Sequence, residues 1–105
     1  MMRRLLSMLL SAGAMAVVPF GPAHATGAIM CKPAPKSSWK SQEALEAKLV
    51  KEGWVVRKSK VDGGCYEVYG TTPSGDRVEA YFHPVTLEKL YVARRGKVLF
   101  RKKGY

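Results

Sequence analysis

The sequence contains few of the residue types from which most catalytic and metal sites are built. Its 105 residues include two histidines, two cysteines and eight acidic side chains against 18 basic ones. No Ser-His-Asp or Cys-His arrangement can be assembled from them with any specificity, and one cysteine pair without a neighbouring histidine is a poor zinc site. The composition therefore predicts a protein that is not an enzyme and that uses neither a metal nor a cofactor.

The chain also lacks an apolar run long enough to span a bilayer. Residues 5–20 carry no charge, but this run of 16 residues is shorter than the roughly 20 that a transmembrane helix needs. Arg3 and Arg4 precede it, and the small-x-small pattern that a signal peptidase reads ends at Ala25. We expect residues 1–25 to be a signal peptide cleaved after Ala25, so that the mature protein is periplasmic or secreted. A retained anchor is the alternative.

The mature chain would be one small basic domain. It has 80 residues, with 16 basic and 8 acidic side chains and a net charge of +8. A domain of this size buries a modest core and often needs a covalent staple. Cys31 and Cys65 both remain after export into an oxidising compartment. We expect an intramolecular disulfide between them, worth roughly 4 kcal/mol by the chain-entropy relation; two free thiols or an intermolecular bridge are the alternatives.

The mature chain begins with an extended segment followed by one helix. Residues 26–38 are rich in proline, lysine and serine, which predicts an extended lead-in. A helix is predicted over about 41–52, because Ser41 is a typical N-cap and an apolar stripe with a spacing of four residues follows. Gly53 stands where a left-handed residue ends a helix.

After the helix the apolar period changes from 3.6 residues to two. Three segments alternate as strands do: 54–61, 65–71 and 77–83. Residues 62–64 and 72–76 between them have the glycine and proline content of hairpin turns. Residues 87–92 are predicted as a fourth short strand and residues 97–100 as a weak fifth one. The predicted fold is α+β, with one N-terminal helix packed on a three- to four-stranded antiparallel sheet.

The residues from the end of the helix to the turn after the third strand resemble the PepSY family of small secreted or membrane-attached domains. The matching motifs are Glu52-Gly53-Trp54, Val55-Val56-Arg57-Lys58, Gly64-Cys65-Tyr66-Glu67-Val68, Gly75-Asp76-Arg77-Val78-Glu79 and Pro84-Val85-Thr86. The likeness covers about residues 39–92, and Leu87 stands where the family's Pro-x-Thr-Gly motif has its glycine. The resemblance implies a helix on an antiparallel sheet and a non-catalytic role, inhibiting or modulating peptidases near the cell envelope.

Two acidic residues are candidates for a paired-carboxylate acid/base site. Glu67 and Glu79 lie on neighbouring predicted strands, which would bring their side chains near each other. We instead expect them to form cross-strand ion pairs with the nearby cations Arg57, Lys58 and Arg77.

His83 is the one histidine that remains after cleavage, and it stands before Pro84 at a strand end. We expect an exposed or hydrogen-bonded edge residue; a general base, or a haem ligand together with Met30, are the less supported readings. Five aromatic residues on the strands are expected to pack in the core or across strands, with an exposed ligand-stacking face as the alternative: Trp54, Tyr66, Tyr69, Tyr81 and Tyr91.

The C-terminal residues 93–105 form a predicted basic tail with no acidic residue. Its cations are candidates for partner or anion contact: Arg94, Arg95, Lys97, Arg101, Lys102 and Lys103. Residues 98–100 place three apolar side chains among them, so the tail could touch anionic lipid, lipopolysaccharide or an acidic protein. A solvated tail that keeps the domain soluble is the alternative. Nucleic acid would also attract these cations, but secretion argues against that partner.

These observations predict a non-catalytic periplasmic PepSY-like module that binds and modulates an envelope protein, with a peptidase as one candidate partner. An exposed sheet edge could accept a strand of the partner, and the basic residues would steer the encounter. The alternative is an envelope-surface binder whose basic run holds anionic lipid or lipopolysaccharide. A small hydrolase is the least supported reading.

Overall fold

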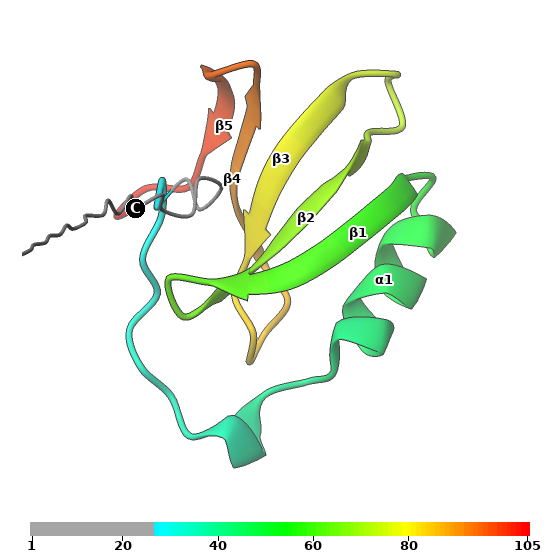
Figure 1. Ribbon diagram of the computed structural model, residues 1–105. Coiled ribbons are helices and arrows are strands. Elements are labelled where there is room, and N and C mark those ends of the chain that lie inside the picture. The colour runs from blue at the N-terminus through cyan, green and yellow to red at the C-terminus, as the bar shows by residue number, and fades with distance from the viewer. Residues whose placement is uncertain (1–26) are drawn as a thin grey trace, which may run out of the picture.

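The computed structural model describes residues 27–105, so the predicted signal peptide lies outside the described residues. Seven elements follow one another: η1 (Lys36–Ser38), α1 (Gln42–Lys51), β1 (Val55–Asp62), β2 (Cys65–Thr71), β3 (Arg77–Phe82), β4 (Lys89–Arg94) and β5 (Lys97–Arg101). The strands form one antiparallel sheet in the order β1-β2-β3-β4-β5 (Figure 1). The predicted α+β class is confirmed. The sheet has five strands against the three to four of the predicted fold, because the weak fifth segment at 97–100 also pairs into it.

Helix α1 begins and ends at the residues that the sequence indicates. The Ser41 hydroxyl accepts a hydrogen bond from the Ala44 backbone N–H at 3.0 Å, which caps the first turn. Gly53, at φ 100°, ends the helix in the left-handed conformation. Leu45 and Leu49 are completely buried against the sheet, so the apolar stripe does fix the face that α1 presents. Within the described residues no helix is long and apolar enough to cross a bilayer.

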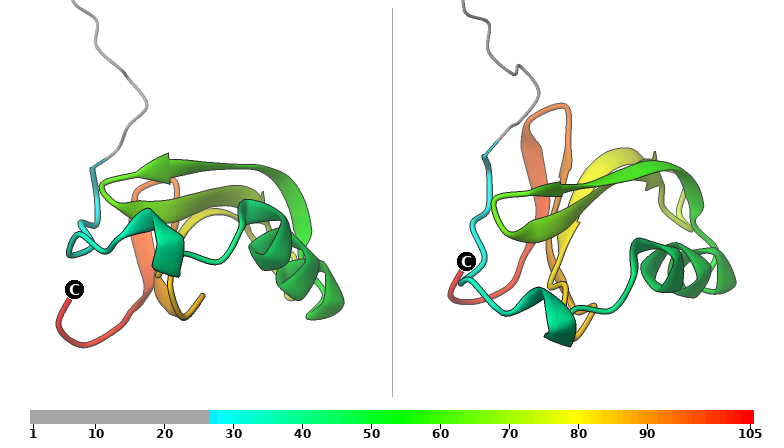
Figure 2. Two further views of the ribbon diagram at one scale, coloured as in Figure 1. Left: turned by 90° about the horizontal axis from the view of Figure 1, so that it is seen from below. Right: turned by 60° about the horizontal axis from the view of Figure 1, so that its bottom comes forward.

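The main core lies between α1 and one face of the sheet. Trp54, directly after the helix, packs edge-on against Phe82 of β3 with ring centroids 5.9 Å apart. The other buried members are Leu45, Leu49, Tyr66, Val68, Val78, Ala80, Leu87 and Val92. Helix α1 lies beside β1, whereas the β4–β5 hairpin lies at the far end of the sheet from it (Figures 1 and 2). A helix of ten residues therefore leaves part of this five-stranded sheet without a helical cover.

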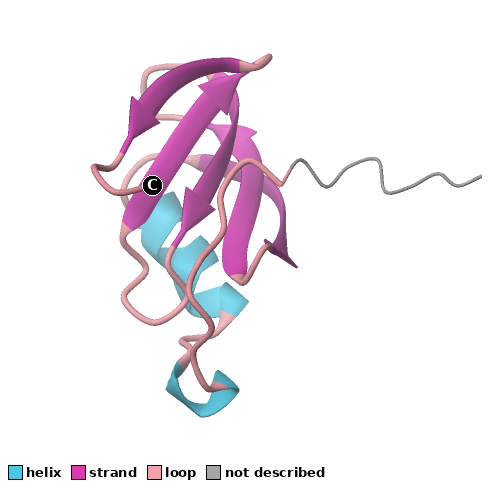
Figure 3. Cartoon of the chain, turned by 90° about the vertical axis from the view of Figure 1, so that its left-hand side faces the viewer, coloured by secondary structure: helices cyan, strands magenta, loops and turns pink. Residues whose placement is uncertain are grey.

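The lead-in packs on the sheet through a second, smaller core. Cys31 and Cys65 form a disulfide, which confirms the predicted pairing. The Cys31 backbone N–H also donates to the Gly63 carbonyl oxygen at 2.8 Å. A Cβ atom on Gly63 would lie 2.6 Å from the Ile29 carbonyl oxygen, so the turn must be glycine for the lead-in to approach. Figure 3 shows this segment running along the sheet toward η1.

The turn between β3 and β4 contains an unusual backbone conformation. Leu87 has φ 64°, the left-handed value that glycine adopts readily and that a leucine adopts at a cost. Its N–H donates to the His83 carbonyl oxygen at 2.7 Å, and its side chain is buried in the main core. The leucine thus keeps the turn that the family's glycine would make, and the burial of its side chain offsets the backbone strain.

Candidate functional site

The two candidate carboxylates occupy different surroundings and do not form a pair of equivalent acids. In the β2–β3 ladder Glu67 is opposite Tyr81, and Glu79 is opposite Tyr69, so the carboxylates lie diagonally across the same face of the sheet. Glu67 is completely buried, and the ammonium of Lys60 lies 3.7 Å from its Oε1. In the described part of the chain neither Glu67 oxygen has a hydrogen bond of good geometry. This is the environment of a structural buried carboxyl.

The predicted ion-pair partners of Glu67 were wrong, and a β-bulge decides which residue of β1 lies opposite this carboxylate. The register of β1 on β2 shifts between Val56 and Lys58. Without the extra residue, Ser59 would lie opposite Glu67; with it, Lys60 does. Arg57, Lys58 and Arg77, the expected partners, form no ion pair within the described residues.

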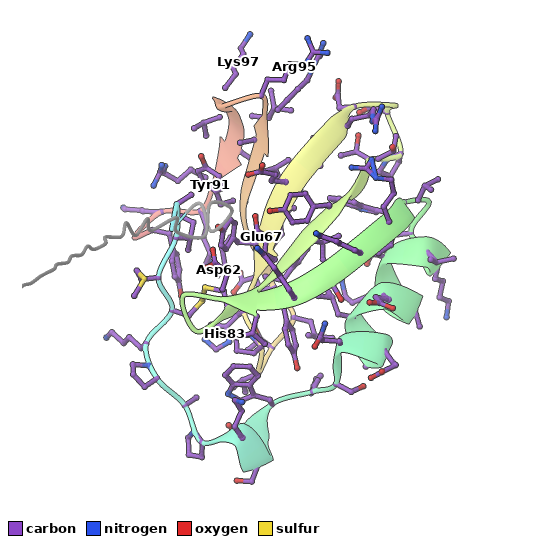
Figure 4. The ribbon with its side chains drawn as sticks, viewed as in Figure 1. Asp62, Glu67, His83, Tyr91, Arg95 and Lys97 are labelled. Carbon is purple, nitrogen blue, oxygen red and sulfur yellow. A yellow bond between two sulfur atoms is a disulfide. The ribbon has the colours of Figure 1, made fainter. Side chains whose placement is uncertain are left out.

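Burial is the main cause of the raised pKa values of Glu67 and Tyr69 on this face of the sheet. Loss of solvation raises the pKa of Glu67 above its ordinary value, while the Tyr69 hydroxyl and the Lys60 ammonium act in the opposite direction. Burial, and then the charge of Glu67, raise the pKa of Tyr69 to about 12. Asp62 accepts a hydrogen bond from the Tyr81 hydroxyl at 2.6 Å. The charge of Asp62 also raises the pKa of Glu67, and in Figure 4 Asp62 and Glu67 lie near each other on the sheet.

His83 has a local structural role. Its Nδ1 accepts a hydrogen bond from the Val85 N–H at 3.1 Å, and its backbone N–H donates to the Glu88 carbonyl oxygen at 2.9 Å. The expectation of a hydrogen-bonded residue at the strand end is confirmed. Figure 4 places His83 on the opposite side of Asp62 from Glu67, so the structure does not bring the candidate base and acid together. Among residues 27–105 there is no group of three or more potential metal ligands.

The aromatic residues are mostly core. Trp54, Tyr66, Tyr81 and Tyr91 are buried, as expected, and the Tyr81 and Tyr91 rings meet edge-on at 5.8 Å. Tyr69 is half-buried under Lys58, whose ammonium lies 5.0 Å from the ring centroid. The ligand-stacking alternative therefore finds no exposed aromatic set on these strands.

The predicted basic tail is part of the sheet, and its six cations fall into two groups. Three are engaged: Arg94 with Asp76 (3.1 Å), Lys102 with Glu88 (2.9 Å), and Arg101 with the Tyr105 carbonyl oxygen (2.8 Å). The other three, Arg95, Lys97 and Lys103, have no partner in the described part of the chain. Arg95 and Lys97 project from the tip of the β4–β5 hairpin (Figure 4).

Strand β5 is an exposed edge. It is the last strand in the sheet order, and all five of its residues are exposed. Its middle residues are apolar: Val98 is 44%, Leu99 43% and Phe100 38% exposed. Three consecutive exposed apolar residues between cations are more than a solubilising tail needs.

A groove opens beside β5 on the same face of the sheet as α1, over the part of that face that the helix does not cover. It encloses about 500 Å³, and its apolar walls come from Trp54, Pro73, Val92, Leu99 and Phe100. The charged residues of the groove are Lys89, whose ammonium lies 4.5 Å from the Phe100 ring centroid, and two acids, Glu52 and Asp76. Both acids are paired, with Lys48 and Arg94. Sequence reasoning missed this groove, because its walls come from the helix end, the β2–β3 turn and the last two strands.

A family model described as peptidase propeptide and YPEB domain matches residues 5–91. The chain belongs to the PepSY family. Domains of this family are generally inhibitory or propeptide-like modules that act on peptidases or other envelope proteins, and they are not catalytic. No curated protein and no solved structure matches the chain. The PepSY match ends within β4, so β5 and the three free cations lie beyond it.

Proposed function

We propose that this protein is a non-catalytic PepSY-type module of the periplasm that binds and modulates another envelope protein, with a peptidase as the first candidate partner. The observation that carries the proposal is the exposed basic edge: β5 with its apolar centre, next to cations that no acidic group of the described chain neutralises. The family assignment supports the class of function, since PepSY modules act by contact with other proteins.

The charge of the protein suits a partner with an acidic surface. The mature chain would carry a net charge of +8. Arg95 and Lys97 stand at the tip of a hairpin, where a partner meets them first. Such an arrangement raises the association rate with an acidic surface at low ionic strength and loses that advantage as salt screens it.

Crosslinking capture tests the proposal. The tagged mature protein is crosslinked in the periplasm of its host, purified, and its partners are identified by mass spectrometry. A charge-reversed variant, Arg95→Glu/Lys97→Glu, should lose the partner. The matched control, Lys40→Glu/Arg57→Glu, makes the same change in charge at exposed positions before α1 and on β1 and should retain it. No reproducible partner, or equal capture by all three proteins, would contradict the proposal.

Anionic lipid is the second candidate ligand, because apolar residues of β5 lie beside the free cations, as in peptides that bind membrane surfaces. Vesicles with and without an anionic lipid separate the two functions. Lipid binding would be lost in Arg95→Glu/Lys97→Glu and would fall steeply as salt is raised from about 50 to about 300 mM. Absence of binding to anionic vesicles at the lower salt concentration would rule the lipid function out.

A further inference from the structure

We propose that β5 accepts an extended acidic segment of the partner as an added strand, and that an apolar side chain of this segment enters the groove beside Trp54. This inference rests on the proposed function and names the chemistry of the partner. It also concerns a part of the molecule that lies outside the residues shared with the family model.

The backbone of β5 provides the first argument. As the last strand of the sheet it pairs only with β4, so one row of its N–H and C=O groups faces away from the sheet. An exposed edge of this kind pairs readily with another extended chain, and natural proteins usually cover or interrupt it. In the described residues nothing pairs with the outer side of β5.

The other edge of the sheet fits a partner strand less well. Strand β1 has its exposed apolar residues, Val55 and Val61, near its two ends, whereas those of β5, residues 98–100, lie together at its centre. Both edge strands have one register irregularity, at Arg57 in β1 and at Leu99 in β5, so this feature does not distinguish them. Three prominent grooves in the described residues are all lined by other elements than β1. By contrast, Leu99 and Phe100 of β5 form a wall of the groove themselves.

The groove supplies side-chain specificity. In strand addition the backbone hydrogen bonds give affinity, and pockets for alternate side chains select the sequence. A strand laid along β5 would direct alternate side chains toward the face that contains Trp54 and Val92. The volume of about 500 Å³ accommodates one large or two medium apolar side chains.

The charges select an acidic segment and disfavour a second copy of this protein. Antiparallel pairing of two β5 strands in full register would place Lys97 opposite Arg101 of the other copy at both ends. Like charges directly opposite each other destabilise a sheet, and two chains of net charge +8 repel. Glutamate or aspartate at the ends of the added strand would instead pair with Lys97 and with Lys103 beyond the end of β5.

The test uses a synthetic peptide of about seven residues, an ordinary strand length, in which glutamates flank an alternating centre of leucine and threonine. Titrated into ¹⁵N-labelled mature protein, it should shift the amides of residues 97–101 and the indole N–H of Trp54. Phe100→Ala should weaken binding by about five- to tenfold, because it removes a wall of the groove. Val61→Ala, which truncates an exposed valine on β1, should leave the affinity unchanged.

Backbone methylation distinguishes strand addition from attraction between charges. Two versions of the peptide carry N-methyl groups on alternate residues, one on odd and one on even positions. Because an added strand hydrogen-bonds through alternate residues, one version should lose at least about tenfold in affinity and the other should bind nearly as well as the parent.

Equal binding by all three peptides, shifts confined to the hairpin tip, or no binding would overturn strand addition. Binding of the matched peptide with lysine in place of glutamate would overturn the acidic selection. The proposed function fails separately, through the absence of a crosslinked partner. A partner captured through Arg95 and Lys97, together with a peptide that does not bind, would leave the function standing and refute the added strand.

Discussion

The disulfide between Cys31 and Cys65 should contribute a large share of the stability of this domain. The two residues are 34 apart in the sequence, and closing a loop of this length in the unfolded chain is worth about 4 kcal/mol at 25 °C. Small domains typically have only about 5–15 kcal/mol in total. The double variant Cys31→Ala/Cys65→Ala should therefore unfold at a temperature lower by roughly 15–30 °C, since each kcal/mol corresponds to about 4–8 °C for a chain of this size.

The loss should begin at the lead-in. Without the covalent bond, noncovalent contacts hold this segment to the sheet, among them the hydrogen bonds from Cys31 to Gly63 and from Gly27 to Asp62 and the burial of Ile29. Urea unfolding of the oxidised protein, the reduced protein and the double variant gives the free energies, and hydrogen exchange locates the change. A difference below about 1 kcal/mol between oxidised protein and double variant would refute the chain-entropy reasoning. Two free thiols in the exported protein would refute the bond itself.

Three further stability predictions follow from the buried carboxyl and two backbone positions. The pKa of Glu67 is raised in the folded protein, so its carboxylate destabilises the fold more and more as the pH rises above the ordinary carboxyl pKa of 4.5. Glu67→Gln should therefore raise the free energy of unfolding by about 1–3 kcal/mol at neutral pH. Urea unfolding should show little difference at pH 4. An unchanged difference between these pH values would contradict this. Leu87→Gly relieves about 1 kcal/mol of backbone strain but loses a buried side chain worth about 2–5 kcal/mol. Thermal unfolding should therefore show a net loss of stability. A more stable variant would show that the strain outweighs the burial. Gly63→Ala should lower stability more than Gly75→Ala, because both have positive φ but only the first places a Cβ against a carbonyl oxygen; equal losses in calorimetry would contradict the close approach.

The helix and the first three strands could be predicted because their signals are local. The cap at Ser41 and the glycine at position 53 fix the ends of α1, and regular alternation marks the strands. The disulfide followed from the number of cysteines and the expected compartment. In each case a short stretch of sequence, or a simple count, contains the physical cause.

The proposed partner-binding surface depends on features that no short stretch of the sequence contains. All residues of β5 are exposed, so no alternation between buried and exposed positions marks it as a strand. The partner of Glu67 depends on a bulge that moves Lys60 into register, and the groove depends on how far α1 reaches across the sheet. Which of the six basic residues remain free is decided by groups elsewhere in the chain: the acids Asp76 and Glu88 and the Tyr105 carbonyl oxygen.

Binding of a partner along β5 can be measured by hydrogen–deuterium exchange of the crosslinked complex, compared with the free protein. If the partner lies along β5, exchange at residues 97–101 should slow, and exchange at the solvent-facing edge of β1 should stay unchanged. Protection of α1 or β1, with the amides of β5 exchanging as fast as in the free protein, would contradict binding along β5.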